Sequence, residues 1–186
     1  MPSKQEINAA LFGAWRLMRF DADGMNWFNL TIEGFWRSFF AALPVAPFFA
    51  LLVYLDFHRE GGPVYVEREI FTTILVYGVG WAIVPLVMVP VTKLLGMSRG
   101  FIPMMVAYNW TTVPQIIIQA LVALPGGMGL ISVELSGAVL FAALVYILVF
   151  EWFVIRTALQ TTAMTAVAIV MLLETLGIII NLIAYQ

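Results

Sequence analysis

The sequence predicts an all-α integral membrane protein with five transmembrane helices preceded by an N-terminal amphipathic, interfacial helix. Three observations support this fold class. First, 62% of the 186 residues are hydrophobic and only 11% are charged, whereas soluble domains carry about 25% charged residues. Second, several uncharged runs reach the length of about 20 residues that a helix needs to cross a bilayer. Third, lysine and arginine are distributed unevenly among the connections between these runs, as the positive-inside rule requires.

Composition also excludes several function classes. The net charge of −2 gives no indication of a nucleic-acid partner, and the absence of cysteine excludes disulfides, thiolate metal sites and cysteine catalysis. The first residues are polar and the first long apolar run begins near Phe35, so no cleavable signal peptide is expected. The only histidine, His58, lies beside Asp56 and Glu60, and one imidazole predicts a solvated loop rather than a metal site. No P-loop, nucleophile elbow, zinc-protease or paired-acid motif occurs, so we expect a non-enzymatic protein without catalytic residues or cofactors.

Residues 1–33 form the predicted N-terminal region. Ser3 and Glu6 match a capping box, which predicts a helix from about residue 5 to residue 19. One face of this helix is apolar and consists of Ile7, Leu11, Ala14, Trp15 and Met18. Arg16 and Arg19 lie on the other face. The pattern favours either a membrane-surface helix that contacts lipids through Trp15, Arg16 and Arg19, or a helix packed on the cytoplasmic end of the bundle. Residues 21–24 predict a break, and residues 25–33 are expected to lead helically into the first span.

Residues 34–186 form the predicted transmembrane bundle. Its five spans cover about residues 35–57, 70–95, 101–124, 131–155 and 162–185. Small residues at helical spacing predict close helix packing, at Ala42, Ala46, Ala50, Gly78, Ala82 and Gly177. The third span should end at residues 125–127, where proline is followed by two glycines.

Polar residues inside the third and fifth spans are the candidate functional residues. The third span carries one stripe of amide and hydroxyl side chains, made of Asn109, Thr112, Gln115 and Gln119. The fifth span carries Glu174 and Asn181 on one face. At 1.5 Å per residue, Glu174 lies about 18 Å and Thr112 about 16 Å from the cytoplasmic ends of their helices. These residues therefore predict one intramembrane polar cluster.

An acid at the centre of a bilayer is costly and is by default a functional hypothesis. Three interpretations of Glu174 remain open. A neutral Glu174 can hydrogen-bond the third-span amides and hold the helices together. Alternatively, Glu174 can carry a proton or an ion, or it can contact a partner protein. Glu151, near the end of the fourth span, is expected to reach water instead.

Charge asymmetry predicts the orientation of the chain. With a cytoplasmic N-terminus, seven basic residues fall on the cytoplasmic side, namely Lys4, Arg16, Arg19, Arg37, Lys93, Arg99 and Arg156. Only Arg59 and Arg68 fall on the other side. The bias predicts that the N-terminus faces the cytoplasm and that the C-terminus lies across the membrane.

The junction of the second and third spans resembles the Yip (Ypt-interacting protein) family. Gly96, Phe101, Ala107-Tyr108 and Pro114 are similar to that family's glycine-rich basic turn followed by Phe and Ala-Tyr-x-x-x-Pro, although the gap from Tyr108 to Pro114 is wider here. The stretch from Trp152 to Ala158 is similar to the family's connection between spans four and five. The resemblance implies a five-helix bundle with a cytoplasmic N-terminus, and the family's bacterial members imply a multi-pass protein of the bacterial inner membrane with a periplasmic C-terminus. The chain lacks the long polar N-terminal region of the family's trafficking members.

Two functions follow as expectations. The first is an interaction, accessory or scaffold subunit of a membrane assembly, which contacts membrane lipids and either other copies of itself as a homo-oligomer or another membrane protein. The alternative is a small transporter or channel component in which Glu174 carries a proton and the third-span amides bind a small solute.

Overall fold

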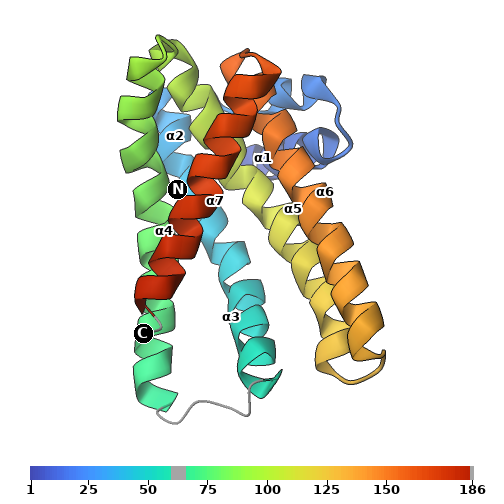
Figure 1. Cartoon of the computed structure of the whole chain (residues 1–186). Coiled ribbons are helices and arrows are strands. Elements are labelled where there is room, and N and C mark those ends of the chain that lie inside the picture. The colour runs from blue at the N-terminus through green and yellow to red at the C-terminus, as the bar shows by residue number, and fades with distance from the viewer. Residues whose placement is uncertain (60–65, 185–186) are drawn as a thin grey trace.

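The computed structural model describes residues 1–59 and 66–184, and of residues 57–59 and 66 only the backbone. Glu60 and the side chain of His58 lie outside this described part. Five long helices run back and forth along one direction (Figure 1), and they are α3 (Ala42–Arg59), α4 (Val66–Leu94), α5 (Phe101–Gly127), α6 (Val133–Leu159) and α7 (Ala163–Ala184). Two shorter helices, α1 (Lys4–Met18) and α2 (Ile32–Ser38), cover one end of the long helices. Three 3-10 helices connect these elements, and they are η1 (Ala22–Trp27), η2 (Phe39–Ala41) and η3 (Ser98–Gly100).

Four helical stretches of the described chain are long and apolar enough to cross a membrane. They are Ile32–Asp56, Glu67–Leu94, Val133–Leu159 and Ala163–Ala184. The predicted all-α fold of membrane type is therefore confirmed in this coarser form. Helix α5 is not among the four, because its amide and hydroxyl side chains lower its mean hydropathy. The structure by itself thus supports four candidate spans rather than the predicted five.

Helix α5 is the centre of the molecule. It packs against α1, α2, α3, α4 and α6, whereas α7 packs against α6 and α4. Buried side chains occur on several sides of α5, including Met104, Ala107 and Trp110. The prediction that residues 101–124 form the core helix is confirmed, since a helix carrying amides needs other helices around it.

Helix α5 ends within the predicted residues 125–127. The helix continues through Pro125 to Gly127 and is closed by Gly129, which has a φ of +68°. There the Leu130 amide donates to the Pro125 carbonyl over 2.9 Å, as in a glycine-closed helix end. The prediction that the helix ends at residues 125–127 is therefore confirmed, and Pro125 itself is still helical because a proline removes only its own hydrogen bond while the preceding turns stay packed.

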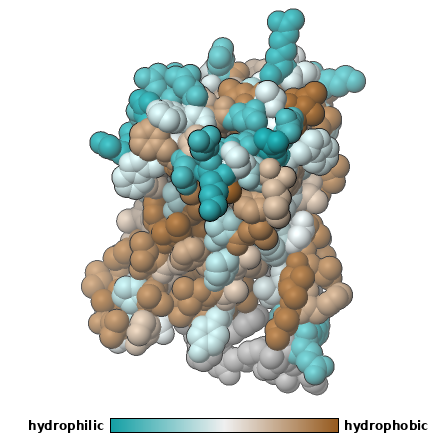
Figure 2. Space-filling view, turned by 180° about the vertical axis from the view of Figure 1, so that it is seen from behind, coloured by the Kyte–Doolittle hydropathy of each residue, from teal (hydrophilic) through white to brown (hydrophobic). Residues whose placement is uncertain are grey.

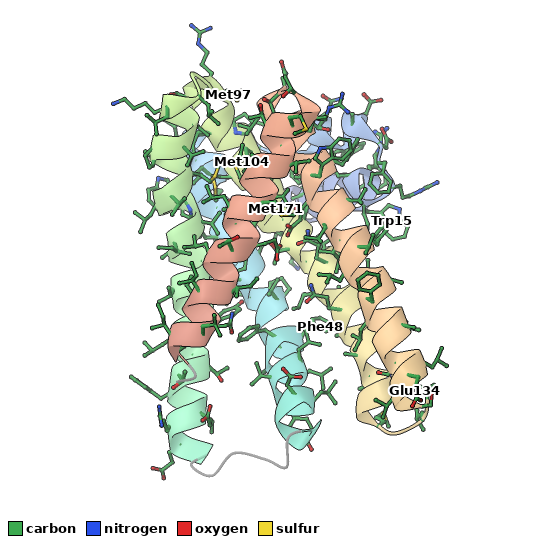
Figure 3. The ribbon with its side chains drawn as sticks, viewed as in Figure 1. Trp15, Phe48, Met97, Met104, Glu134 and Met171 are labelled. Atoms are coloured by element: carbon green, nitrogen blue, oxygen red, sulfur yellow. The ribbon has the colours of Figure 1, made fainter. Side chains whose placement is uncertain are left out.

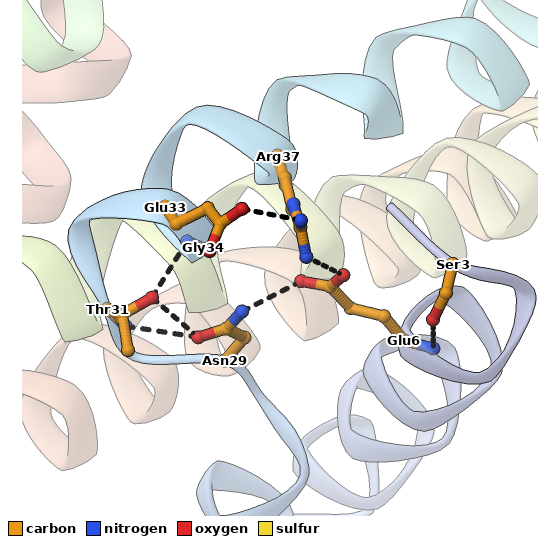
Figure 4. Close-up of polar contacts among 7 residues, drawn as sticks. All are labelled: Ser3, Glu6, Asn29, Thr31, Glu33, Gly34 and Arg37. Carbon is orange, nitrogen blue, oxygen red and sulfur yellow. Dashed lines mark hydrogen bonds and ion pairs between the residues drawn. The ribbon is translucent and has the colours of Figure 1, made fainter. Parts of the chain in front are cut away.

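A polar network joins α1 to α2 (Figure 4). The Ser3 hydroxyl accepts from the Glu6 amide over 3.1 Å, which confirms the predicted start of α1. The Glu6 carboxylate accepts instead from the Asn29 side-chain amide at 2.9 Å and from the Arg37 guanidinium at 2.8 Å. The second half of the predicted capping box is therefore replaced by a contact between elements, and Glu6 holds the N-terminal helix against the beginning of the α2 stretch.

The connection between α1 and α2 is not the continuous helix that we predicted for residues 25–33. Phe28 follows η1 in an extended conformation, and Thr31 caps α2 by accepting from the Gly34 amide over 3.0 Å. The Asn29 side-chain carbonyl accepts from the Thr31 hydroxyl over 2.7 Å. The side chains of Thr31 and Asn29 thus form local hydrogen bonds that compete with helix formation. The periodicity of apolar residues, from which the helix was predicted, does not detect this competition.

Helix α1 buries a face that overlaps the predicted one only in part, through Ala14 and the partly buried Ile7 and Met18. Ala10, Gly13, Ala14 and Leu17 are buried. Leu11 and Trp15 from the predicted apolar face are exposed. Gly13 determines this choice, because a Cβ atom there would lie 2.8 Å from the Gly24 carbonyl oxygen. Only glycine permits this close approach of α1 and η1. Ala10 and Ala14 therefore face inward together with Leu17, whereas Leu11 and Trp15 face outward.

Candidate functional site

A buried glutamate on α6 marks the candidate site. Glu151 is only 7% exposed, and its Oε1 accepts a hydrogen bond from the Gln115 side-chain amide of α5 over 3.3 Å. Its Oε2 is fully buried and accepts no hydrogen bond from an N–H or hydroxyl group of the described residues. The group beside it is the carboxyl group of Glu174, so a proton held between the two acids is what can satisfy this buried oxygen.

Glu174 of α7 is the second acid of the site. It is half-buried, and its carboxyl group interacts directly with that of Glu151. Tyr108 of α5 lies within electrostatic range of both carboxyl groups. At 1.5 Å per residue, Glu151 is about 12 Å from the end of α6 and Glu174 about 16 Å from the start of α7, and these two helix ends adjoin. We call Glu151 and Glu174 the acid pair.

A pocket of about 780 Å³ opens beside Glu174. Its walls come from α4, α5 and α7, and we call it the α4–α7 pocket. Gly80 and Val84 line it on the α4 side, whereas Tyr108 belongs to α5. On α7 the rim includes Ile178 and Leu182, which are exposed. The pocket is therefore mostly apolar with a carboxyl group at one place on its wall, as in many small-molecule sites.

A second pocket of about 260 Å³ adjoins the first one. The two pockets share Gly80, Tyr108, Gly177 and Asn181 as wall residues. The second pocket adds predicted polar residues of α5, Asn109 and Thr112, to its wall. The structure thus brings Asn109, Thr112, Glu174 and Asn181 around one connected space, although not into one hydrogen-bonded cluster.

The residues of the predicted polar cluster form hydrogen bonds with different partners rather than with one another. The Asn109 amide donates to the Ser38 hydroxyl of α2 over 2.8 Å. Thr112 and Asn181 donate to carbonyls of their own helices, those of Tyr108 and Gly177. Gln119 is half-buried one turn beyond Gln115. The expected bonds from Glu174 to Asn109, Thr112 or Gln115 are absent among the described residues, because Glu151 occupies the position opposite Gln115.

The small residues predicted to pack helices together do so only in part. Ala42 and Ala46 are half-buried in α3, whereas Ala50 is exposed. Gly78, Ala82 and Gly177 are exposed, and a Cβ atom at Gly78 or Gly177 would meet no atom within 4 Å. Within the described chain no helix lies close to Gly78 or Gly177, so the chain's own helices do not supply the predicted packing there. The spacing of small residues in a sequence identifies a helix face that allows close packing. It does not identify which other helix packs on that face, or whether one does.

The predicted membrane-surface residues lie at the periphery of the end covered by α1 and α2. Trp15 is 50% exposed (Figure 3) and Arg19 is exposed. Arg16 instead pairs with Asp21 at 2.6 Å. One face of α1 thus packs on the helices beneath, as the second interpretation of α1 expects. The outer face presents aromatic side chains, and its contact with lipids stays a prediction.

Hydrophilic side chains gather at this same end of the molecule, and apolar side chains cover much of the remaining surface seen in Figure 2. The last turn of α4, η3 and the last turn of α6 also reach this end (Figure 1). They carry Lys93, Arg99 and Arg156. Arg68 lies in the first turns of α4, at the opposite end. The polar end is thus also the end to which sequence analysis assigned most of the positive charge.

Sequence reasoning missed Glu151 as a site residue. We expected it to reach water beside Trp152 and Arg156, but α6 continues to Leu159. Glu151 therefore lies two turns inside the helix. Trp152 and Arg156 do lie toward the surface, with the guanidinium 5.3 Å from the indole centroid. The helix end at Gln160, where the backbone is left-handed, was not predicted from the sequence. The depth of Glu151, too great for its short side chain to reach water, therefore became visible only in the structure.

Among the described residues, no three histidine, aspartate or glutamate side chains converge as a metal site would require. Comparisons with protein-family models, with curated proteins and with solved structures found no match to this chain.

Proposed function

We propose that this chain is a non-enzymatic, five-span membrane protein that binds and moves a small solute, with the acid pair as its proton-carrying group. The observation that carries the proposal is the direct contact between the buried carboxyl group of Glu151 and the carboxyl group of Glu174, where Oε2 of Glu151 meets no N–H or hydroxyl donor of the described residues. Two carboxyl groups in contact away from water hold a proton between them, because both cannot ionise at once. Intramembrane acids that face a cavity are typical of proton and solute pathways.

The fifth span of this proposal is α5. Its 27 residues extend about 40 Å, which exceeds the hydrocarbon thickness of about 30 Å. Its amides are tolerated because other helices of the bundle surround it. The positive charge at the end covered by α1 and α2 favours a cytoplasmic N-terminus and an opposite C-terminus. The Yip resemblance agrees with this arrangement and supports a bacterial inner-membrane location with a periplasmic C-terminus.

Proteoliposomes loaded with a pH-sensitive dye test the proposed function. With small solutes of different classes on one side, organic cations among them, the wild-type protein should dissipate an imposed pH gradient faster than empty liposomes. Glu174→Gln should reduce the protein-dependent rate at least tenfold, since an amide carries no proton. Glu134→Gln provides the matched control, because Glu134 is an exposed acid at the far end of α6 (Figure 3). An unchanged rate for a folded Glu174→Gln protein would contradict the proposal.

A second candidate function is an accessory or scaffold subunit. The uncovered faces at Gly78, Ala82 and Gly177 favour it, because exposed small residues let a helix of another subunit approach closely. The mass of the protein, extracted from its own membrane in mild detergent, tests this function. An assembly with a different membrane protein that dissociates in Gly78→Leu would support it, and a wild-type monomer with full transport activity would refute it.

A further inference from the structure

The α4–α7 pocket has a composition that selects a particular class of ligand. Its walls are built from aliphatic residues and glycines of α4 and α7, such as Ile83, Val84 and Leu176. The polar residues on the wall are Tyr108, Glu174 and Asn181. No lysine, arginine or histidine occurs among the described residues that line it. The only charge that this wall can present is therefore negative.

Glu151 adds a second ionisable carboxyl group behind the wall. Of the elements packed around the pair, α5 contributes Tyr108 and the neutral amide of Gln115, and α4 contributes no charged side chain to the pocket. Two carboxylates side by side in a water-poor site repel each other, and one positive charge between them relieves the repulsion. A cation can take the place of the proton that the two carboxyl groups otherwise share, because Oε2 of Glu151 accepts no hydrogen bond from an N–H or hydroxyl group of the described residues.

We infer that the acid pair and the α4–α7 pocket bind an organic monocation with an apolar body, in competition with a proton. This inference rests on the proposed function, since it names the solute class of the same site. The pocket volume of about 780 Å³ lies within the range of about 300–1,000 Å³ that drug-sized ligands occupy. The exposed rim at Ile178 and Leu182 gives an apolar molecule direct access from the bilayer.

Binding of tetraphenylphosphonium to the purified full-length protein tests the inference. Tetraphenylborate has nearly the same size and shape but the opposite charge, so it serves as the control ligand. In lipid nanodiscs, equilibrium dialysis should show saturable binding of the cation and only non-specific partition of the anion. The affinity for the cation should fall as the pH is lowered, because protonation removes the charge that attracts it.

Variants distinguish a loss of the binding site from a general loss of folding. Glu174→Gln should weaken cation binding at least tenfold, and Glu151→Gln should weaken it and flatten its pH dependence. Gly80→Leu should block binding by filling the pocket, since a Cβ atom at Gly80 meets nothing within 4 Å. Gly137→Leu is the matched control on α6, where the added side chain also meets open space. Equal binding of cation and anion, or unchanged binding in both Glu174→Gln and Gly80→Leu, would overturn the inference.

The two proposals can fail independently. If the cation does not bind but the wild-type protein dissipates a pH gradient through Glu174, the solute class is wrong and the transport function stands. If the cation binds with the expected dependence on Glu174 but no flux occurs, the site stands and the transport function is wrong.

Discussion

At Gly34 the backbone of α2 passes so close to Asn29 that no side chain fits. A Cβ atom on Gly34 would lie 1.8 Å from the Asn29 carbonyl oxygen. This contact belongs to the same turn in which Thr31 caps α2, and Asn29 binds Glu6. The lack of a side chain at Gly34 therefore permits the whole polar network between α1 and α2.

Gly34→Ala should lower the free energy of unfolding by about 3 kcal/mol, because the methyl group clashes with backbone rather than with a flexible side chain. Thermal unfolding followed by tryptophan fluorescence in detergent measures the effect. Gly78→Ala is the control: its methyl group meets no atom within 4 Å, and alanine should stabilise the α4 helix by up to about 1 kcal/mol. Equal unfolding temperatures for the two variants would show that the turn at Gly34 is not packed as described.

At the residue scale, the acid pair also shows that residue types alone do not predict which side chains lie next to each other. Both glutamates are visible in the sequence, yet only the packing of α6 against α5 and α7 makes Glu151 a buried neighbour of Glu174. Their separation of 23 positions and their location in different helices give no periodic signal. The chemistry of the site therefore depends on a helix–helix contact and not on a local motif.

At the scale of elements, α1 and η1 form a unit held by a charged clamp. The Arg16 guanidinium donates to the Asp21 carboxylate at 2.6 Å and also lies 3.5 Å from Asp23. Asp21 accepts from the Asp23 amide as well and so starts η1. On the α6 side, the Tyr146 hydroxyl donates to the Met18 carbonyl over 2.6 Å, which fastens the end of α1 to the bundle.

The clamp predicts a pH dependence. The hydrogen bond from Arg16 holds the pKa of Asp21 below its ordinary value of 3.8, with further lowering by the Asp23 amide. Because the pKa is lower in the folded state, the stabilising contribution is fully present above about pH 3.8 and is lost as the pH falls toward the folded-state pKa. Asp21→Asn should therefore lower the unfolding temperature at neutral pH, and its difference from the wild type should shrink in acid.

Unfolding temperatures of the wild type and Asp21→Asn between neutral pH and about pH 3 measure this effect. Asp23→Asn is the control, because the Asp23 side chain is mostly exposed and lies farther from Arg16. A constant difference between the wild type and Asp21→Asn across the whole pH range would contradict the role of the clamp.

At the scale of the whole molecule, the five long helices alternate in direction, and the polar end carries α1, α2 and most of the basic residues (Figures 1 and 2). In the proposed five-span arrangement, α5 crosses the membrane, so the loop before it and the loop after it lie on opposite sides of the membrane. Ser98 precedes α5 and is exposed on the polar side, whereas Leu130 follows α5 and is exposed at the opposite end.

Cysteine labelling tests this arrangement, and the native chain offers a background without cysteine. In right-side-out vesicles, Leu130→Cys should react with a membrane-impermeant maleimide, whereas Ser98→Cys should react only after permeabilisation. Labelling of both positions from the same side would show that α5 does not cross the membrane and that the protein has four spans.

The sequence by itself determined the all-helical membrane-type class, the positions of the long helices and the central place of α5. These features follow from composition, from run length and from the periodicity of polar residues, which act locally along the chain. The start of α1 was equally predictable, from the N-cap residue Ser3 three positions before Glu6. The segment of residues 25–33 was not, because side-chain hydrogen bonds of Asn29 and Thr31 compete there with the helix.

Only the tertiary structure decided which faces are covered and which acids meet. It placed Gly13 and Ala14 of α1 inward and Trp15 outward, and it left Gly78 on the surface of α4. It also joined Glu151 to Glu174 beside a pocket that sequence spacing does not reveal. The physical reason is that the sequence of each helix shows where its apolar side chains lie. Which of these side chains become buried, and which acids interact, depends on contacts between helices that are far apart in the chain.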